Sequence, residues 1–226
     1  NIKKGMIFAA IEGKNIKGID YCEQAIKYGA NTVLCKNNDF KKISGSNTNI
    51  LTSKNIRLAV SSICKKIFSK QPKNIVAVTG TNGKTSITFY LQSIWKKANI
   101  NSATIGTLGL RYKKKVISTK LTTPDPIFLY RNVDLLRSKN INYLALEASS
   151  HGIKQNRIDA LKINRGVFCN LSRDHLDYHK NLENYFITKM RLFSEILDKK
   201  GIAIVNNSCE YGKKVEQYCK KNHIKV

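Results

Sequence analysis

The stretch Ile75-Val-Ala-Val-Thr-Gly-Thr-Asn-Gly-Lys-Thr-Ser86 decides the fold of this chain, because it joins an apolar strand to a glycine-rich turn. Gly80 and Gly83 allow backbone N–H groups to approach phosphate oxygens without a Cβ atom in the way. The pattern is typical of a P-loop that binds a nucleoside triphosphate. Val78 stands where the first glycine of that pattern belongs. An ordinary strand-to-helix turn therefore remains the alternative at this point.

The residues that follow the turn supply the chemistry that a triphosphate needs. Lys84 can reach the outer phosphates, and the hydroxyl of Thr85 can bind Mg²⁺. Residues 86–98 are predicted to form a helix, whose amino-terminal dipole would face the phosphates. The sequence thus predicts a site for ATP and Mg²⁺ at the end of this strand.

Length and composition indicate an ordinary globular protein. The chain has 226 residues, of which 42% are hydrophobic, and this is enough for one large domain or a small domain plus a larger one. No apolar run approaches the ~20 residues of a membrane span, and no basic-then-apolar leader opens the chain. We therefore expect a cytoplasmic protein without a membrane partner. The six cysteines show neither C-x-x-C pairs nor zinc spacing, which favours buried thiols.

The net charge of +25 is the strongest compositional bias of the chain. A basic patch attracts phosphate backbones, so a nucleic-acid partner is one interpretation. The lysines are scattered, however, and aromatic residues are not interleaved with them. Asparagine, isoleucine and lysine are abundant together, as in the products of AT-rich coding sequences. We therefore expect no nucleic-acid partner, although the charge would help to attract an anionic substrate.

Residues 1–70 are predicted to form a small α/β unit. Gly29 follows a helical pattern and is a candidate C-cap. A hinge is expected at Ser69–Lys73, which contains Pro72. The expected strands are Gly5–Ile11, Thr32–Cys35 and Ile50–Leu51, and the expected helices are Tyr21–Tyr28 and Ile56–Phe68.

Residues 71–226 alternate between strand and helix patterns, which predicts a mainly parallel sheet covered by helices on both faces. The fold class is therefore α/β, with a small first domain and a larger second domain. The expected strands are Ile75–Thr79, Ser102–Ile105, Tyr143–Glu147, Gly166–Asn170 and Ile202–Asn206, and the expected helices are Ser86–Ala98, Pro126–Ser138 and Glu183–Leu197.

Polar and ionisable residues follow three of these strands. Strand 75–79 enters the P-loop, strand 143–147 ends in Glu147, and strand 166–170 leads into a segment that contains His175. In parallel sheets, ligands collect beyond the carboxyl ends of the strands. The convergence predicts an active site at this edge of the sheet.

Three side chains near that edge have a chemical interpretation and an ordinary alternative. Glu147 suits a Mg²⁺ position near the γ-phosphate, or else it is a solvated acid at a strand end. His175 could complete an octahedral metal shell, or else it is a hydrogen-bonded loop histidine. Arg157 could hold a phosphate or carboxylate through two hydrogen bonds, or else it is a surface arginine.

Two further features are less informative by themselves. Thr122-Thr-Pro-Asp125 precedes a predicted helix and reads as an N-terminal cap with proline near the helix start. Lys189 lies on an amphipathic helix, where a lysine is ordinarily a surface residue that extends its charge into water.

Taken together and in this order, four motifs resemble the Mur ligase family. They are Gly80-Thr-Asn-Gly-Lys-Thr-Ser86, Thr122-Thr-Pro-Asp125, Glu147-Ala-Ser-Ser-His-Gly152 and Asn170-Leu-Ser-Arg-Asp-His-Leu-Asp-Tyr-His179. The last motif is long and specific, and the missing first P-loop glycine is normal in this family. The resemblance spans nearly the whole chain, but only about half of a family member.

The resemblance implies a role for each matching position. Lys84, Lys189 and His175 match catalytic positions, and Lys189 matches a lysine that is carbamylated in the family. A carbamate is anionic and offers oxygens to Mg²⁺, whereas an amine with a pKa of ~10.4 is a poor metal ligand. The positions that match ATP contacts are Gly80, Thr81, Asn82, Gly83, Lys84, Thr85 and Ser86. Those that match metal contacts are Thr85, Glu147, His175 and Lys189. Those that match substrate contacts are Lys14, Asn15, Ile16, Thr122, Thr123, Ser149, Gln155 and Arg157.

The resemblance implies ATP-dependent amide-bond formation in peptidoglycan biosynthesis. The third amino acid, meso-diaminopimelate or L-lysine, would join UDP-N-acetylmuramoyl-L-alanyl-D-glutamate. The D-glutamyl γ-carboxylate attacks the γ-phosphate of ATP, and the incoming amino group then displaces phosphate from the acyl phosphate. The alternatives are a D-alanyl-D-alanine-adding Mur ligase, a folylpolyglutamate synthase, and a nonenzymatic nucleotide-binding module that holds nucleic acid.

We expect this chain to be a fragment of such an enzyme and to be monomeric. It begins with Asn1 rather than methionine, and the family's Asp-Ser-Arg uridine-nucleotide motif would fall just before that residue. The family's C-terminal amino-acid-binding domain is also expected to be absent. The chain alone is therefore expected to be inactive, and tripeptide formation by the isolated 226 residues would contradict this.

Overall fold

The computed structural model describes residues 2–13, 15–43 and 48–226, and the chain divides into two compact units, residues 1–63 and 64–226. The division lies within α2 (Ile56–Ile67). The boundary predicted at residue 70 lies a little further along, between α2 and β4 (Asn74–Thr79). The two units are described one at a time.

The first unit is a three-stranded parallel sheet in the order β1-β2-β3, with short helices. Its core is a cluster of buried residues that includes Cys22, Val33 and Cys35. Its strands are β1 (Ile7–Ala9), β2 (Thr32–Cys35) and β3 (Asn49–Thr52). Its helices are α1 (Cys22–Lys27) and two 3-10 helices, Gly18–Tyr21 and Asn37–Lys42.

Two glycines shape the ends of elements in this unit. β1 is shorter than the predicted strand Gly5–Ile11, because Gly5 has a φ of 88° and so cannot extend the strand. Gly29 has a φ of 98° and follows Tyr28, the C-cap residue of α1, in the left-handed conformation that ends many helices. The C-cap role predicted for Gly29 is therefore confirmed.

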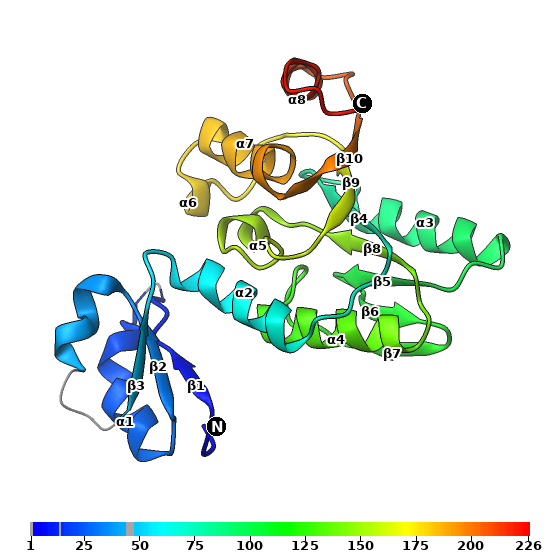
Figure 1. Ribbon diagram of the computed structural model, residues 1–226. Coiled ribbons are helices and arrows are strands. Elements are labelled where there is room, and N and C mark those ends of the chain that lie inside the picture. Colours follow the sequence, from blue (N-terminus) through cyan, green and yellow to red (C-terminus); the bar gives the residue numbers. More distant parts are fainter. Residues whose placement is uncertain (1, 14, 44–47) are drawn as a thin grey trace. The chain divides into compact units, whose positions relative to one another are not determined.

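The second unit is built on one seven-stranded sheet, whose order is β10-β9-β4-β8-β5-β6-β7 (Figure 1). The pairs among β10, β9, β4, β8 and β5 are parallel, and β6 and β7 extend the sheet in antiparallel pairs. The remaining strands are β5 (Ser102–Gly106), β6 (Gly109–Tyr112), β7 (Lys115–Ile117), β8 (Tyr143–Glu147), β9 (Ile163–Phe168) and β10 (Leu197–Val205).

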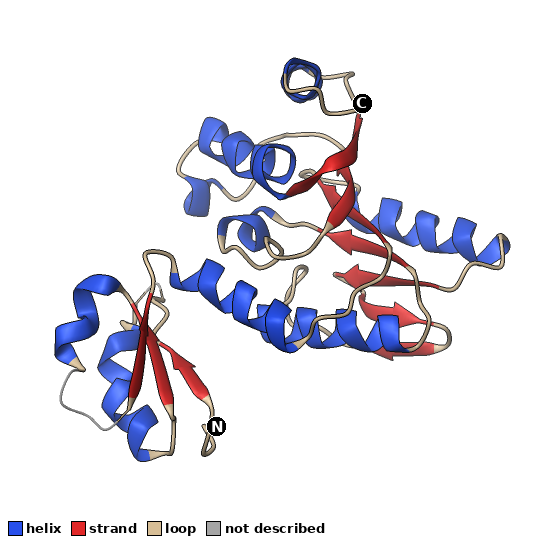
Figure 2. Cartoon of the chain, viewed as in Figure 1, coloured by secondary structure: helices blue, strands red, loops and turns tan. Residues whose placement is uncertain are grey.

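Helices alternate with these strands (Figure 2). They are α3 (Lys84–Lys97), α4 (Pro126–Ser138), α5 (Ser150–Lys154), α6 (Leu176–His179), α7 (Leu182–Arg191) and α8 (Glu210–Lys221). The alternation carries the chain back to the same end of the sheet after each helix, which is why the strands run mainly parallel.

Alternate side chains of the central strands face opposite helical layers. Val78 of β4 and Val167 of β9 belong to a cluster that packs against α3. Phe168, the next residue along β9, instead packs against Phe186 of α7 and Phe193 just beyond it. Figure 1 shows α3 and α7 on opposite sides of the sheet. The predicted mainly parallel sheet with both faces covered is therefore confirmed.

The hairpin formed by β6 and β7 was not predicted. These strands pair around a two-residue turn, Lys113–Lys114, and Lys113 has a φ of 51°. A two-residue turn whose first central residue has a positive φ usually places glycine, asparagine or aspartate there. A Lys-Lys pair carries no such signal, so the sequence pattern did not reveal the hairpin.

The predicted helix Glu183–Leu197 corresponds to a continuous helical segment that ends at Ile196, and only its last part departs from α-helical geometry. A π-helical turn covers Leu192–Ile196, and Leu197 already belongs to β10. The pairing of β10 with β9 shifts register between Leu197 and Ile202, so the regular part of β10 is close to the strand predicted from residue 202. The apolar residues at the end of the predicted helix form the π-helical turn between α7 and β10.

Within the described ranges, no helix combines the length and the apolar character needed to cross a membrane. All six cysteines are free thiols, and five of them are buried. The cysteine interpretation drawn from spacing therefore agrees with the structure.

Candidate active site

The P-loop joins β4 to α3 at the carboxyl end of the sheet. A Cβ atom on Gly80 would lie 2.8 Å from the Cβ atom of Cys169, so a side chain does not fit there. Gly83 has a φ of 84° and is the N-cap of α3. Because Gly83 has no side chain, no side-chain cap occupies the first N–H groups of α3. These groups lack partners within the helix and point toward an incoming ligand.

Two lysines converge on the backbone of the P-loop. The Nζ atom of Lys84 donates to the carbonyl oxygens of Gly80 at 2.9 Å and Thr81 at 2.8 Å. The Nζ atom of Lys189, from α7, donates to the same Gly80 oxygen at 2.9 Å. Lys189 is 1% exposed and lies 4.3 Å from the centre of the Tyr185 ring. The ordinary interpretation of Lys189 as a surface lysine is therefore wrong.

Burial shifts the acid–base properties of both lysines. Loss of solvent around Lys84 lowers its pKa, although Glu147 opposes the shift. Burial lowers the pKa of Lys189 to about 7, and the nearby charge of Lys84 adds to that effect. A buried ammonium group lacks the water that stabilises its charge. A large share of Lys189 is consequently a neutral, nucleophilic amine near neutral pH.

Glu147 is 1% exposed and ends β8, so the alternative of a solvated strand-end acid is wrong. Its carboxylate accepts hydrogen bonds from the Thr85 hydroxyl at 2.9 Å, the Thr107 backbone N–H at 2.9 Å and the Thr107 hydroxyl at 3.1 Å. A Cβ atom on Gly106 would lie 2.0 Å from this carboxylate, so glycine makes room for it. The carboxylate is held in place by the first turn of α3 and by the residue that follows β5.

Thr107 was not singled out in the sequence. It follows β5, and β5 lies beside β8 in the sheet. The rule that polar residues after parallel strands gather at one edge would have found it, because Ser102–Ile105 was already a predicted strand. Its role is to orient Glu147.

The residues predicted to contact the substrate form one hydrogen-bonded group beside Glu147. The Thr123 hydroxyl donates to the Glu147 backbone carbonyl at 2.7 Å and lies 2.9 Å from the Ser149 hydroxyl. Arg157 donates to the Thr123 carbonyl and to the Gln155 side chain. The structure therefore brings together Thr122, Thr123, Ser149, Gln155 and Arg157, since the Thr122 hydroxyl also lies 3.1 Å from that of Thr107. The capping interpretation is confirmed as well, because Asp125 accepts from the Phe128 N–H and Pro126 opens α4.

The other predicted substrate residues belong to the first unit. Lys14 lies outside the described residues. The carbonyl of Ile16 accepts a hydrogen bond from the Gly13 N–H at 2.9 Å. Contact between residues 14–16 and a uridine nucleotide stays a prediction.

His175 lies in the loop between β9 and α6, with a left-handed φ of 50°. Its backbone N–H donates to the Asp174 carboxylate at 2.8 Å, and its ring lies 4.9 Å from that of His151 in an edge-on arrangement. No hydrogen bond among the described residues links His175 to Glu147 or Lys189. The structure thus joins Thr85 with Glu147 and Lys84 with Lys189, but leaves His175 in a neighbouring aromatic group.

That aromatic group contains His151, Tyr178, His179 and Tyr185, with neighbouring ring centres 4.1 to 5.9 Å apart. Burial lowers the pKa of His179 to about 4, with smaller contributions from nearby cations. Burial also lowers the pKa of His151. These rings form a largely uncharged wall beside the two lysines at neutral pH.

The donor set at Thr85 and Glu147 suits a magnesium ion. A hydroxyl and a carboxylate are the hard oxygen ligands that Mg²⁺ prefers, and Mg²⁺ commonly keeps several waters and binds substrate phosphates. Among the described residues, no three histidine, cysteine, aspartate or glutamate side chains gather as a metal cluster. The oxygens of Thr85 and Glu147 would supply two ligands of the ion, and waters and substrate phosphates would supply most of the others. This agrees both with the donor types and with the lack of a metal cluster among the described residues.

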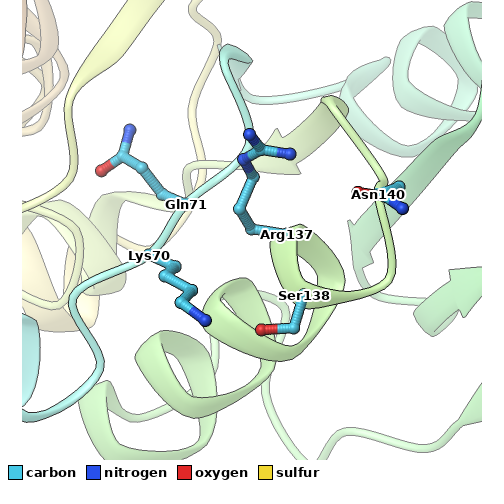
Figure 3. A pocket seen from close by; sticks show the side chains of 5 residues that line it. All are labelled: Lys70, Gln71, Arg137, Ser138 and Asn140. Carbon is cyan, nitrogen blue, oxygen red and sulfur yellow. The ribbon is translucent and has the colours of Figure 1, made fainter.

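Three hollows of the second unit lie away from this site. One of about 480 Å³ is lined by Lys70, Gln71, Arg137, Ser138 and Asn140 (Figure 3). It shares Asn140 with a hollow of about 590 Å³, which in turn shares Lys113, Lys114 and Lys115 with one of about 530 Å³. We call the cations that line them the basic face; they are Lys70, Lys96, Arg111, Lys113, Lys114, Lys115, Arg137 and Lys139.

Comparison with known proteins agrees with the arrangement at the P-loop edge. The sequence model of the Mur ligase middle domain matches residues 78–226, more than half of the chain. The chain belongs to the Mur ligase family. The resemblance seen in the motifs is thereby confirmed, and this Mur ligase has the α/β fold expected of it.

Three relatives of this chain, two known by sequence and one by structure, share the same name. A UDP-N-acetylmuramoyl-L-alanyl-D-glutamate–2,6-diaminopimelate ligase from Bradyrhizobium diazoefficiens is 37% identical over 205 residues, which are 91% of this chain and 41% of the relative. A ligase of the same name from Rickettsia prowazekii is 35% identical over 228 residues, which are 99% of this chain and 47% of the relative. A solved structure of a ligase with this name covers the whole chain with a TM-score of 0.83 and 28% identity, and this chain covers 45% of it. The chain therefore spans less than half the length of the relatives it matches.

Proposed function

We propose that this chain forms the nucleotide-binding core of an ATP-dependent ligase that adds diaminopimelate to UDP-N-acetylmuramoyl-L-alanyl-D-glutamate. The names of the relatives support this substrate pair and favour diaminopimelate over the L-lysine that the motifs also allowed. The proposal includes a monomeric, cytoplasmic protein without a membrane or nucleic-acid partner.

The observation that carries the proposal is the content of one sheet edge. A P-loop with two lysines on its backbone lies beside a buried carboxylate, Glu147, that contacts the P-loop hydroxyl of Thr85. The hydrogen-bonded group of Thr123, Ser149 and Arg157 is attached to the backbone carbonyl of the same residue, Glu147. A triphosphate and a carboxylate substrate would therefore meet at this edge.

The first proposed step joins two anions, so its main obstacle is charge repulsion. An oxygen of the D-glutamyl γ-carboxylate bonds to the γ-phosphorus, and the bond from that phosphorus to the bridging oxygen of ADP breaks. Lys84 would leave the carbonyls of Gly80 and Thr81 and donate to the outer phosphates, where charge-assisted hydrogen bonds are strong. Arg157 and the hydroxyls of Thr123 and Ser149 would orient the muramoyl substrate. Fixed donors of this kind stabilise developing charge without reorganisation.

In the second proposed step the neutral amine of diaminopimelate attacks the acyl carbon. The bond to the phosphate oxygen breaks, phosphate leaves, and the amine nitrogen loses a proton to form the amide. The buried ring of His179, on which His151 and Tyr178 pack, would exclude water from part of this edge and so help to protect an acyl phosphate from hydrolysis.

Thr85 and Glu147 would hold Mg²⁺, together with His175 and a modified Lys189. Magnesium, when bound, supplies charge neutralisation at the phosphates. The fit rests on Thr85 and Glu147, whose oxygens are already adjacent. His175 would bind the same ion only if its loop moved the imidazole ring toward Thr85 and Glu147.

Carbamylation of Lys189 is part of the proposal. A pKa of about 7 leaves neutral amine available, and that amine can bond to the carbon of CO₂ and release one proton. Loading the chain with ¹³C-labelled bicarbonate should give a carbamate carbon resonance that is absent in Lys189→Met. Identical spectra for the two proteins would contradict this part.

A chimera tests the overall function. This chain would replace the aligned segment of the Rickettsia prowazekii relative, because the alignment covers 99% of it. We expect tripeptide formation and ADP release that depend on both UDP-N-acetylmuramoyl-dipeptide and diaminopimelate. Turnover with UDP-N-acetylmuramoyl-tripeptide and D-alanyl-D-alanine, or with a folate, would favour the alternative enzymes instead. A chimera that folds but converts none of these substrates would contradict the proposal.

A further inference from the structure

Asn170 lies just beyond β9, where the loop that leads to His175 begins. Its side-chain oxygen accepts hydrogen bonds from the backbone N–H groups of Thr81 at 3.1 Å and Asn82 at 3.0 Å. Its side-chain nitrogen donates to the Asn82 carbonyl at 3.2 Å. One amide thus satisfies three backbone groups of the P-loop, and only this orientation of the amide makes all three bonds.

Neighbouring residues hold the same part of the P-loop from the same side. The backbone N–H of Ser172 donates to the Thr81 hydroxyl at 3.0 Å, and that hydroxyl lies 3.3 Å from the Ser172 carbonyl. Tyr185 forms a side-chain hydrogen bond with Thr81, and Lys189 donates to the Gly80 carbonyl. The first half of the loop, Gly80–Asn82, is therefore tied to the β9–α6 loop and to α7.

The second half of the P-loop has a different environment. Gly83 provides no side-chain cap for α3, so the N–H groups that begin the helix have no partner within it. The two halves of this loop therefore differ in their partners. The first half is hydrogen-bonded to other parts of the protein, and the second half leaves backbone donors for a ligand.

We propose that Asn170 is a positioning residue for the nucleotide. By occupying the N–H groups of Thr81 and Asn82, its amide fixes the loop in the shape that aims the first N–H groups of α3 at the phosphates. This inference rests on the proposed function. A loop that is ordered before binding does not have to lose conformational freedom when the phosphate arrives, and affinity rises accordingly.

The chain offers a matched control at the other end of the same two strands. Asn164 of β9 accepts a hydrogen bond from the Ile75 N–H of β4 at 2.9 Å. It is also an asparagine side chain of the β9 segment that binds backbone of the β4 segment, but at the amino end, away from the P-loop. Loss of either side chain should affect the packing of the sheet, whereas only loss of Asn170 should affect the nucleotide.

The test measures Mg²⁺-ADP affinity of the 226-residue chain by calorimetry and the exchange of individual amide hydrogens by NMR. Asn170→Ala should weaken ADP binding by about 10-fold or more, since each hydrogen bond lost from a positioned loop typically changes an equilibrium several-fold. The amide hydrogen of Asn82 should exchange faster, whereas the Thr81 N–H keeps a second acceptor, the backbone carbonyl of Asn170 at 3.1 Å. Asn164→Ala should leave ADP affinity within about twofold.

The variant Asn170→Asp separates the effect of positioning the P-loop from an effect on the overall stability of the fold. The carboxylate keeps the shape and can still accept from Thr81 and Asn82, but it cannot donate to the Asn82 carbonyl. We expect intermediate ADP affinity with amide protection retained. Should Asn170→Ala fail to fold, this variant carries the test, and wild-type affinity in it would count against the inference.

The outcomes distinguish this inference from the function on which it rests. If the wild-type chain binds Mg²⁺-ADP and Asn170→Ala binds it equally well, the inference is overturned and the proposed function stands. Equal losses in Asn170→Ala and Asn164→Ala also overturn it, because both would then act through stability alone. If the folded wild-type chain does not bind the nucleotide, the proposed function fails and the inference fails with it.

Discussion

The two ends of the parallel strands in the second unit differ in how their charges are used. At the carboxyl end, Lys84, Glu147 and Lys189 are buried or half-buried, and each makes a hydrogen bond with the P-loop. At the amino end, the basic face gathers eight cations around hollows that no aspartate or glutamate lines. Within the described part of the chain, none of those eight cations forms an ion pair.

The difference shows that convergence of side chains, and not charge density, distinguishes the candidate active-site end of this sheet. The basic face has more charge, but six of its eight side chains are exposed and Arg111 and Arg137 are half-buried, so that their mutual repulsion acts largely through water. The P-loop edge has few charges. Each of them interacts strongly with its neighbours, because the dielectric constant is low there and the geometry is fixed. A net charge of +25 therefore locates no site in this chain.

The largest expected effect is a change in nucleotide affinity, and it distinguishes the P-loop edge from the basic face. Lys84→Ala should weaken ADP binding by about 10-fold to 100-fold, because a charge-assisted hydrogen bond to phosphate is worth about 1.5–3 kcal/mol. Lys114→Ala at the basic face should change it less than about twofold. Calorimetry on both variants measures the difference, and equal losses would mean that overall charge attracts the nucleotide.

A second comparison uses one carboxylate from each end. Glu147→Gln should remove most of the increase in ADP affinity that Mg²⁺ gives, by about 10-fold, since the amide cannot replace an anionic oxygen ligand. Asp134→Asn is the control, because Asp134 accepts from the Lys70 N–H beside the basic face. Titrations with and without Mg²⁺ measure both variants. An unchanged magnesium effect in Glu147→Gln would remove Glu147 from the metal site.

The pH dependence of unfolding tests the buried lysine. The ordinary pKa of a lysine side chain is 10.5 and that of Lys189 is about 7 in the fold. Between these values the unfolded chain binds more protons, so the contribution of Lys189 makes the fold more stable as pH rises through this window. Below pH 7 the full cost of burying the charge is present.

Lys189→Met removes that cost. We expect the variant to exceed the wild type in free energy of unfolding by about 1–3 kcal/mol near pH 6.5, with the difference shrinking toward pH 10. Denaturant melts in CO₂-free buffer measure it, and Lys114→Met provides an exposed control. A difference that stays constant across this pH range would show that Lys189 does not titrate as proposed.

The smallest effect is expected at the basic face itself. Replacing Lys113, Lys114 and Lys115 together by glutamine should change the free energy of unfolding by less than about 0.5 kcal/mol. Binding of a labelled oligonucleotide should be weak in the wild type and disappear as salt is raised, because such binding comes from counterion release alone. Tight binding that survives physiological salt would restore the nucleic-acid interpretation.

Local patterns in the sequence predicted most of the scaffold, and they predicted which side chains would lie together at the P-loop edge. The alternation of apolar strands and helices predicted the parallel sheet, and the P-loop predicted where its functional edge lies. The hairpin of β6 and β7 escaped prediction because its Lys113–Lys114 turn carries no glycine. Thr107 and Asn170 received no role, because their partners, Glu147 and Asn82, are distant in sequence.

By itself, the sequence determined the order of the elements, the P-loop and the family, because these depend on residues that are adjacent along the chain. Only the tertiary structure decided that Lys189 is a buried amine and not a surface charge, and that Glu147 is an enclosed carboxylate. The reason is physical: the pKa and the hydrogen-bond partners of a side chain depend on the solvent and on residues brought near by folding, and neither is written in local spacing.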